Sequence, residues 1–405
     1  EDLPRTPVTV LTGALGSGKT TLVKYVLEKP HGYRVAVIQN EFSTEMGMES
    51  PLIVDAKGDE FKDIYELPNG CLCCSAKDGL INMLDRLLEQ KARFDYVLVE
   101  ATGIADPESL CEIFWVDDGL GCHVYLDGIV TLVDGCNALS ALGSAKGDAA
   151  GLGLEAETAK QVACADVLIL NKSDLAPEAE RARVAERLRA MNPTAKLLES
   201  KFAAVELGDI LGIRAFDRTR VEDAFAGLRL PGNDGAGSGA HGHDSGHGDG
   251  HGHGHGLSHG EHGAADPGCG ECHEIQRKAK GVLVADHGVE SFLLRGDGPE
   301  ALYDQDLVRS WLSNVLWEDV GGFVFRCKGL FQGPAEDVAM DGAPRGLATY
   351  ALQGVGKLFE IDEPPYRDGD RVPVPLSRFL FIGRSLQPEV LEEGLRGCLW
   401  RGDGP

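Results

Sequence analysis

The chain has 405 residues, enough for about two or three domains, and its net charge is −25. This acidic balance argues against a nucleic-acid partner, because proteins that bind phosphate backbones carry a basic surface. No apolar run approaches the roughly 20 residues that a membrane-spanning helix needs, so we expect no membrane partner.

The first half of the chain alternates apolar strands with helices. Strands are predicted at 8–14, 33–41, 94–103, 126–134 and 165–174. Helices are predicted at 19–28, 78–91 and 177–190. Because the strands are apolar almost throughout, we expect a mostly parallel sheet that helices cover on both faces. This order predicts a doubly wound α/β domain with its site at the carboxyl ends of the strands.

The composition changes after about residue 230. Residues 231–273 are rich in Gly and His and lack apolar periodicity, so we predict a disordered linker. Beyond it, strands are predicted at 280–286, 290–296, 323–331, 348–361 and 377–385, and helices at 304–316 and 388–398. We therefore divide the chain into an α/β domain at 1–230, the linker at 231–273 and a smaller α+β domain at 274–405.

The stretch GALGSGKT, residues 13–20, fits the phosphate-loop pattern G-x4-G-K-[ST] between a strand and a helix. Its glycines let successive N–H groups wrap a phosphate, and Lys19 reaches the β- and γ-phosphates. The Thr20 hydroxyl is the expected Mg²⁺ ligand. The nucleotide-binding candidates here are Gly13, Ala14, Leu15, Gly16, Ser17, Gly18, Lys19, Thr20 and Thr21.

The stretch NKSD follows the strand at 165–174. The Asp174 carboxylate can accept two N–H bonds from guanine, which adenine cannot offer. Asn171, Lys172 and Ser173 are expected to support the base. Alone, this pattern also fits a solvated turn, but with a phosphate loop upstream it favours GTP over ATP. These two motifs predict a P-loop GTPase domain.

The stretch VEATG ends the strand at 94–103. Glu100 is expected to hold the Mg²⁺ shell, and Gly103 to sense the γ-phosphate. A strand-end Glu in a surface salt bridge is the alternative. Lys19 and Glu100 are the catalytic candidates, and no catalytic base is identified. Glu41 lies in an acidic segment, 39–49, that suits a switch.

The stretch NGCLCC places three thiols within four positions. Cys71 and Cys74 have the C-x-x-C spacing of a redox motif, but Cys73 between them would compete, and no thioredoxin-like pattern surrounds them. Thiolates select ions such as Zn²⁺ or Cu(I), and three leave a tetrahedral ion one ligand short. We therefore predict a Zn²⁺ site at Cys71, Cys73 and Cys74, which Glu41 could complete.

Eight of the 12 histidines lie between His241 and His262. Neutral imidazoles bind Zn²⁺, Ni²⁺ or Co²⁺, so we expect weak accessory metal ligands in this segment, or otherwise a neutral linker. These accessory candidates are His241, His243, His247, His251, His253 and His255. CGECH follows at 269–273, where further metal ligands are favoured over c-type haem attachment.

The cysteine count is 11, an odd number spread over a long chain. Such thiols favour a reducing compartment, so we expect a cytoplasmic protein, with the nucleus as the alternative. No positively charged start leads into an apolar stretch, so no signal peptide is expected. The scattered cysteines are predicted to be small core residues: Cys111, Cys136, Cys164, Cys327 and Cys398.

In this order, GALGSGKT, NEF, GCLCC, VEATGIADP and NKSD resemble the CobW-like metallochaperone GTPases, and in particular the eukaryotic zinc-regulated GTPase metalloprotein activators. The later RCKGLF and FIGRSL resemble the C-terminal domain of that family. The resemblance implies a GTPase that carries Zn²⁺ at its C-x-C-C motif to a client metalloenzyme, which is methionine aminopeptidase in the eukaryotic group. It also implies that five residues lie beside the nucleotide: Cys74, Ser75, Ala76, Lys77 and Asp78.

We therefore expect release of Zn²⁺ in step with GTP hydrolysis. A zinc-storage protein that buffers metal with its histidines is one alternative. A cobalt or nickel insertase, which differs only in metal and client, is another. A P-loop kinase is the third, although it would not need Asn171 or Asp174.

Overall fold

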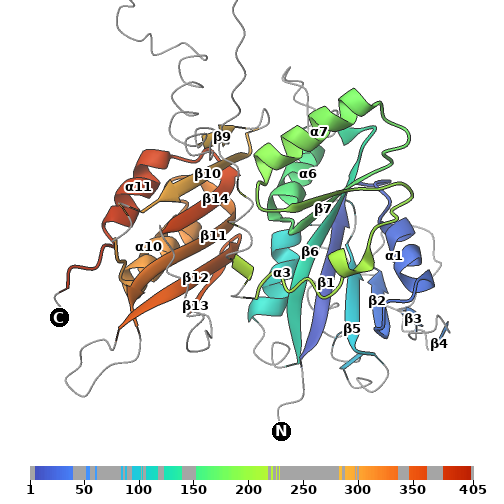
Figure 1. Ribbon diagram of the computed structural model, residues 1–405, viewed down its shortest axis with the longest axis horizontal. Helices are drawn as coiled ribbons and strands as arrows, with labels where there is room; N and C mark the ends of the chain where they lie inside the picture. Colours follow the sequence, from blue (N-terminus) through green and yellow to red (C-terminus); the bar gives the residue numbers. More distant parts are fainter. Residues whose placement is uncertain are drawn as a thin grey trace, which may run out of the picture.

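The chain folds into two β-sheets with helices packed against them, as the computed structural model shows (Figure 1). The structure describes 5–39, 52–54, 60–61, 84, 87–88, 94–101, 103, 106–116, 123–138, 152–217, 220–221, 225, 228, 282–284, 288–296, 298, 301–335, 346–362 and 377–402. The predicted domain boundaries, at 230/231 and 273/274, lie outside these residues.

The first sheet has eight described strands in the order β4-β3-β2-β5-β1-β6-β7-β8. Their bounds are β1 Thr6–Gly13, β2 Val35–Gln39, β3 Leu52–Val54, β4 Glu60–Phe61, β5 Tyr96–Glu100, β6 Val124–Asp134, β7 Val167–Asn171 and β8 Lys196–Glu199. The run from β2 to β8 is parallel, and β3 and β4 add an antiparallel edge. The mostly parallel sheet is thus confirmed, although β3, β4 and β8 were not predicted.

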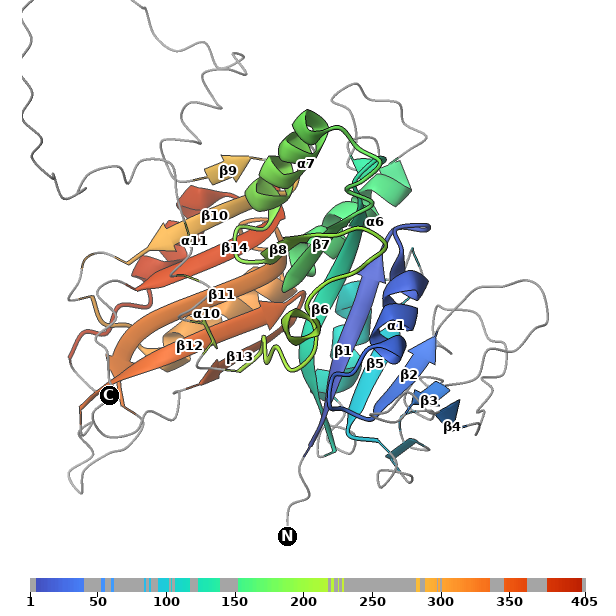
Figure 2. The same ribbon diagram turned by 45° about the vertical axis from the view of Figure 1, so that its right-hand side comes forward.

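Helices cover both faces of this sheet (Figure 2). The helices are α1 Lys19–Glu28, α3 Pro107–Val116, α6 Leu152–Cys164 and α7 Glu178–Met191. Val35 and Val37 pack in one cluster with α1, whereas Ala36 and Ile38 pack in another with α3. This alternation explains why the strands are apolar at nearly every position. The helices at 19–28 and 177–190 are confirmed within one residue, but α3 and α6 were not predicted.

The second sheet is antiparallel, with the order β13-β12-β11-β14-β10-β9. Its strands are β9 Val282–Val284, β10 Glu290–Arg295, β11 Phe323–Pro334, β12 Leu347–Val355, β13 Leu358–Asp362 and β14 Arg378–Arg384. Its helices are α10 Gln305–Trp317 and α11 Pro388–Arg396, as predicted. The single strand predicted at 348–361 was wrong: the chain turns at Gly356, whose φ is +56°, and makes a hairpin.

Both faces of the second sheet are buried. Phe379 and Phe381 pack against α10 and α11, whereas Leu380 and Ile382 belong to a core cluster that also contains residues of α6 and α7. The two sheets therefore share one hydrophobic core, and the C-terminal sheet is seated on helices of the first domain.

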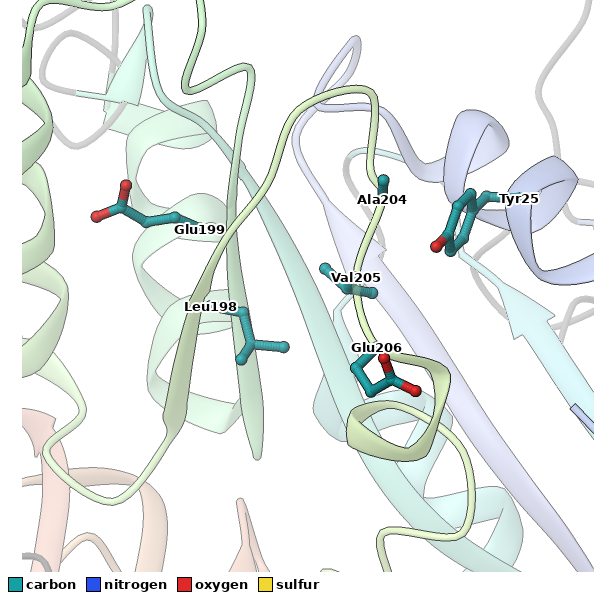
Figure 3. Close-up of a pocket in the computed structure, with 6 residues that line it drawn as sticks. All are labelled: Tyr25, Leu198, Glu199, Ala204, Val205 and Glu206. Carbon is teal, nitrogen blue, oxygen red and sulfur yellow. The ribbon is translucent and has the colours of Figure 1, made fainter. Parts of the chain in front are cut away.

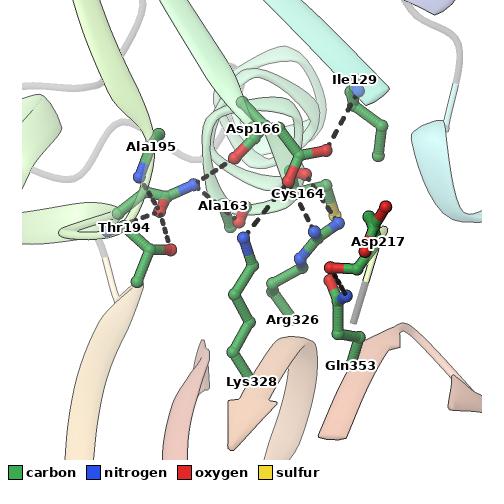
Figure 4. A network of polar contacts seen from close by, with 12 residues as sticks. Ile129, Ala163, Cys164, Asp166, Thr194, Ala195, Asp217, Arg326, Lys328 and Gln353 are labelled. Carbon is green, nitrogen blue, oxygen red and sulfur yellow. Dashed lines mark hydrogen bonds and ion pairs between the residues drawn. The ribbon is translucent and has the colours of Figure 1, made fainter. Parts of the chain in front are cut away.

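Buried charges also cross this junction (Figure 4). The Arg326 guanidinium lies 2.6 Å from Asp166 Oδ1, and Lys328 Nζ lies 3.4 Å from the same oxygen. Arg326 also donates to the Cys164 carbonyl at the end of α6, at 3.3 Å. The pairing satisfies charges that would be costly to bury alone. No helix of the described part is both long and apolar enough to cross a membrane.

Candidate nucleotide site

The phosphate loop links β1 to α1 and is built for close backbone approach. Gly18 has φ +109°, and a Cβ there would lie 2.3 Å from Asn171 Nδ2. A side chain at this position would therefore strain the backbone and displace Asn171. Gly18 is also the N-cap of α1 and caps it without a side chain, which suits a helix start that faces an anion.

Lys19 lies over this loop. Its Nζ donates to the carbonyls of Gly13 and Ala14, at 2.9 and 3.2 Å. Ser17 is fully buried within the loop, and its Oγ has no hydrogen-bond partner among the described residues. An ammonium group and an unsatisfied hydroxyl are thus gathered in one loop, as an anion site requires.

Thr20 and Glu100 meet below the loop. Thr20 Oγ1 donates to Glu100 Oε1 at 2.8 Å, and Glu100 is 3% exposed. The structure thus brings together the two residues predicted as Mg²⁺ ligands. A surface salt bridge, the alternative for Glu100, does not fit so buried a carboxylate.

Gly103 lies directly against the phosphate loop. A Cβ at this position would be 2.7 Å from Leu15 N, so only glycine fits here without displacing the loop. Its carbonyl accepts a hydrogen bond from Gln161 Nε2 at 3.1 Å. Gln161 was not predicted as a site residue, because nothing in the local sequence links α6 to Gly103.

Asn171 joins the phosphate loop to a second loop. Its Nδ2 donates to the Ser17 carbonyl at 2.9 Å, while its Oδ1 accepts from Ser200 Oγ and Ala203 N, each at 2.9 Å. Its side chain is therefore occupied by protein atoms, and it supports the base loop indirectly.

Lys172 and Asp174 differ in their surroundings. Lys172 Nζ lies 2.8 Å from Asp134 Oδ2, an ion pair at the ends of two adjacent strands. Burial would raise the pKa of Asp134, but hydrogen bonds from Lys172, Cys136 and Asn137 outweigh burial and lower it. Asp174 is exposed, so its carboxylate is accessible to a ligand.

The loop after β8 was missed by the sequence analysis. It places Ser200 and Ala203 on Asn171 and leaves Phe202 76% exposed in a left-handed conformation, with φ 53°. The only local signal was the stretch LLES at 197–200, too short and polar to predict a strand.

Several predicted metal and nucleotide ligands lie outside the described residues. These are Cys71, Cys73, Cys74, Ser75, Ala76, Lys77, Asp78, Glu41, His241, His243, His247, His251, His253 and His255. The described residues contain no group of three or more His, Cys, Asp or Glu that could hold a metal ion.

Four of the scattered cysteines are buried as predicted: Cys111, Cys164, Cys327 and Cys398. The prediction for Cys136 was wrong, since this residue is exposed in the turn after β6. Burial raises the pKa of the Cys164 thiol to about 12, which suits a packing role instead of a thiolate ligand.

A shallow pocket lies between α1 and the loop after β8 (Figure 3). Its lining residues are Tyr25, Leu198, Glu199, Ala204, Val205 and Glu206, and none is a predicted site residue. Two carboxylates in the lining disfavour phosphate, so this pocket is no candidate for the phosphate site.

Two family models match the chain. Residues 7–199 match the model described as CobW/HypB/UreG, nucleotide-binding domain, and residues 289–399 match the cobalamin synthesis protein cobW C-terminal domain. The chain has a Zn(II)-bound YjiA GTPase from E. coli as a structural neighbour, with a TM-score of 0.58 and 24% identity over 98% of this chain and 99% of that one. This likeness confirms the fold.

Curated relatives carry related names. The zinc-regulated GTPase metalloprotein activator 1 of Schizosaccharomyces pombe is 28% identical over 95% of this chain and 81% of its own length. The protein of the same name from Saccharomyces cerevisiae is 35% identical over 54% of this chain and 53% of its own length. The zinc chaperone YjiA of Escherichia coli is 36% identical over 52% of this chain and 62% of its own length.

The matches with the Saccharomyces cerevisiae and Escherichia coli proteins thus span about half to three fifths of the length of those proteins. The two family models together reach both sheets, and the phosphate loop lies within the first of them. The protein is therefore a GTPase that belongs to the CobW-like family of metallochaperones.

Proposed function

We propose that the protein is a zinc chaperone that binds GTP at the phosphate loop and passes Zn²⁺ to a client metalloenzyme as GTP is hydrolysed. The observation that carries the proposal is the meeting of Thr20, Glu100 and Gly103 at one loop. The names of the zinc-regulated and zinc-chaperone relatives support zinc as the cargo.

In this proposal the backbone amides of 13–18 wrap the phosphates, and Lys19 exchanges its bonds to Gly13 and Ala14 for phosphate oxygens. Such preorganised donors stabilise the negative charge of phosphoryl transfer. Asp174 reads guanine through two accepted N–H bonds, and Asn171 keeps its loop in register with the phosphate loop.

Mg²⁺ fits the donor set at Thr20 and Glu100. A hydroxyl and a buried carboxylate, 2.8 Å apart, are hard oxygen donors beside the phosphate loop. Proteins hold Mg²⁺ through one or two such groups together with substrate phosphates. The ion would supply charge neutralisation there.

The Zn²⁺ cargo is assigned to Cys71, Cys73 and Cys74, with Glu41 as a further ligand and the histidines of 241–262 as accessory ligands. In this proposal the bound nucleotide controls Zn²⁺ affinity through the segment that links the phosphate loop to Gly103, and the three cysteines fall within this segment of the chain. To change zinc affinity a thousandfold, the GTP and GDP states must differ by about 4 kcal/mol.

The test measures bound Zn²⁺ in protein that lacks 241–262, with a non-hydrolysable GTP analogue, with GDP and with no nucleotide. We expect one tightly bound ion whose affinity depends on the nucleotide. Replacing the three cysteines of the C-x-C-C motif by Ser should abolish binding of this ion, and retained tight binding would contradict the assignment.

A storage protein gives a different result in the same experiment, because deletion of the histidines would remove most of its zinc capacity. Methionine aminopeptidase, which the family resemblance implies as the client, is the first candidate acceptor. GTP-dependent activation of its metal-free form would identify it, whereas equal activation by free Zn²⁺ and by the loaded protein would exclude it.

A further inference from the structure

The side chain of Gln161 holds the backbone of Gly103. Gln161 is fully buried on α6, and its Nε2 donates to the Gly103 carbonyl at 3.1 Å. Its neighbour Lys160 lies 2.8 Å from Asp106 and 2.6 Å from Glu108, at the start of α3. Helix α6 therefore holds the segment that follows β5 at two points, at Gly103 and at the start of α3.

Helix α6 is itself fixed to the centre of the sheet. The Gln161 carbonyl accepts from Thr131 Oγ1 at 3.1 Å, and Thr131 shares a 2.7 Å hydroxyl contact with Thr12, next to the phosphate loop. All three residues are buried. A buried polar chain of this kind resists displacement, because each unpaired member would cost free energy.

The C-terminal sheet packs against the C-terminal end of α6, one turn after Gln161. Cys164, the last residue of α6, accepts from Arg326 through its carbonyl, and its thiol lies 3.6 Å from the Phe325 carbonyl. Glu108, which Lys160 holds, also accepts from Lys357 N in the β12–β13 turn at 3.2 Å. The same helix thus touches Gly103 at one point and the C-terminal domain one turn away.

We infer that Gln161 is a positioning residue for GTP: its side chain holds the Gly103 backbone in the position that contacts the γ-phosphate. Helix α6 transmits a change in this position to β11 of the C-terminal domain. This inference rests on the proposed role of Gly103. GDP lacks the γ-phosphate, so loss of Gln161 weakens GTP binding and spares GDP binding.

The test compares Gln161→Leu with the wild-type full chain. We expect the affinity for a non-hydrolysable GTP analogue to fall about tenfold, the worth of one buried hydrogen bond, and GDP affinity to change less than about twofold. Tyr96→Phe is the matched control, because Tyr96 donates to Asp127 at 2.6 Å in a buried network away from the phosphate loop.

Each outcome decides one claim. If wild-type protein binds both nucleotides alike, Gly103 is no γ-phosphate sensor and that part of the proposed function fails. If wild type discriminates between the nucleotides and Gln161→Leu discriminates equally, or loses affinity for both nucleotides alike, the positioning role is overturned.

Hydrogen exchange in β11 tests the connection to the C-terminal domain. We expect the backbone amides of β11 that carry a hydrogen, 323–333, to exchange at different rates with the GTP analogue and with GDP in wild type, and at equal rates in Gln161→Leu. Equal exchange rates in wild type with both nucleotides would show that the effect of the γ-phosphate does not extend beyond α6 to β11.

Discussion

Asn171 shows how one side chain can serve a nucleotide site without touching the nucleotide. Its amide spans from Ser17 in the phosphate loop to Ser200 and Ala203 in the loop after β8. The three hydrogen bonds use both its donor and its acceptor, and the residue is 2% exposed. Asn171 therefore fixes the phosphate loop relative to the loop after β8.

Replacement of Asn171 by Ala should weaken GTP and GDP binding equally, because Asn171 ties the loop of Asp174 to the phosphate loop, and in the proposed site both nucleotides contact these two loops. We expect a loss of about tenfold to a hundredfold, since the Ser17 carbonyl is left buried and unpaired. Calorimetric titration with both nucleotides measures it. A loss confined to GTP would contradict the role, and Gln161→Leu serves as the comparison with GTP-selective loss.

Asp174→Asn should shift the base preference from guanosine to xanthosine nucleotides. An amide presents a donor where the exposed carboxylate presents only acceptors, which suits the carbonyl of xanthine. Competition between GDP and xanthosine diphosphate measures the preference. Glu178→Gln, at an exposed carboxyl four residues away, should leave it unchanged. Unaltered preference in Asp174→Asn would remove Asp174 from the base site.

Lys328 is buried, and its surroundings in the folded protein favour the uncharged form of its side chain. Burial and the charge of Arg326 lower its pKa from 10.5 to about 8, although Asp166 acts in the other direction. The unfolded chain therefore holds more protons between about pH 8 and pH 10.5. The charged Lys328 side chain therefore lowers the free energy of unfolding by its full amount below pH 8, and this effect is lost as the pH rises toward 10.5.

Unfolding by urea at about pH 7 and about pH 10 tests this sign. Relative to Lys328→Met, the free energy of unfolding of wild type should rise by on the order of 2 kcal/mol at the higher pH. The matched control is Leu330→Met, at a buried position of the same strand that carries no titratable group, for which the difference from wild type should not depend on pH. A constant difference for Lys328→Met would refute the lowered pKa.

At the scale of elements, α6 ends in a cap that α7 supplies. Asn192, just after α7, donates to the carbonyls of Val162, Ala163 and Ala165 at 2.9, 3.1 and 2.8 Å. Asn192→Leu should therefore lower the free energy of unfolding by roughly 2–4 kcal/mol, because three carbonyls at the helix end lose their hydrogen bonds from this side chain. Urea unfolding measures it. Asn314→Leu, on the exposed face of α10, should change stability by less than about 0.5 kcal/mol.

These elements also show what sequence patterns can reveal. The strands β1, β5, β6 and β7 were predictable because burial on both faces makes them apolar throughout. Helix α6 was not, since its sequence LGLEAETAKQVAC is rich in small residues and its apolar side is split between two cores. Strand β8, with exposed residues at both ends, has almost no apolar signal.

The site divides in the same way. The phosphate loop and NKSD were predictable because each is a contiguous motif at a strand end. The partners of Asn171 lie 154, 29 and 32 residues away in the chain, and Gln161 lies 58 residues from Gly103. Only the packing of α6 and β8 on the sheet brings these residues together.

At the scale of the whole molecule, the two sheets are expected to unfold together. The face of the C-terminal sheet that carries Leu380 shares its core with α6 and α7, so this sheet cannot separate without exposing apolar surface on both sides. A ligand that binds the first domain should therefore stabilise the second as well.

Hydrogen exchange in β14 with and without GDP tests this coupling. In wild type, GDP should slow exchange in β14 as well as in β1, because both open in one transition. Leu380→Ala should confine the protection to the first domain. Leu352→Ala is the matched control: Leu352 is equally buried but faces α10 and α11, so its loss costs a similar roughly 2–5 kcal/mol and preserves the coupling. If GDP slows exchange in β1 but not in β14 in wild type, the two sheets unfold independently. The contact between α6 and the C-terminal sheet is then not a cooperative interface.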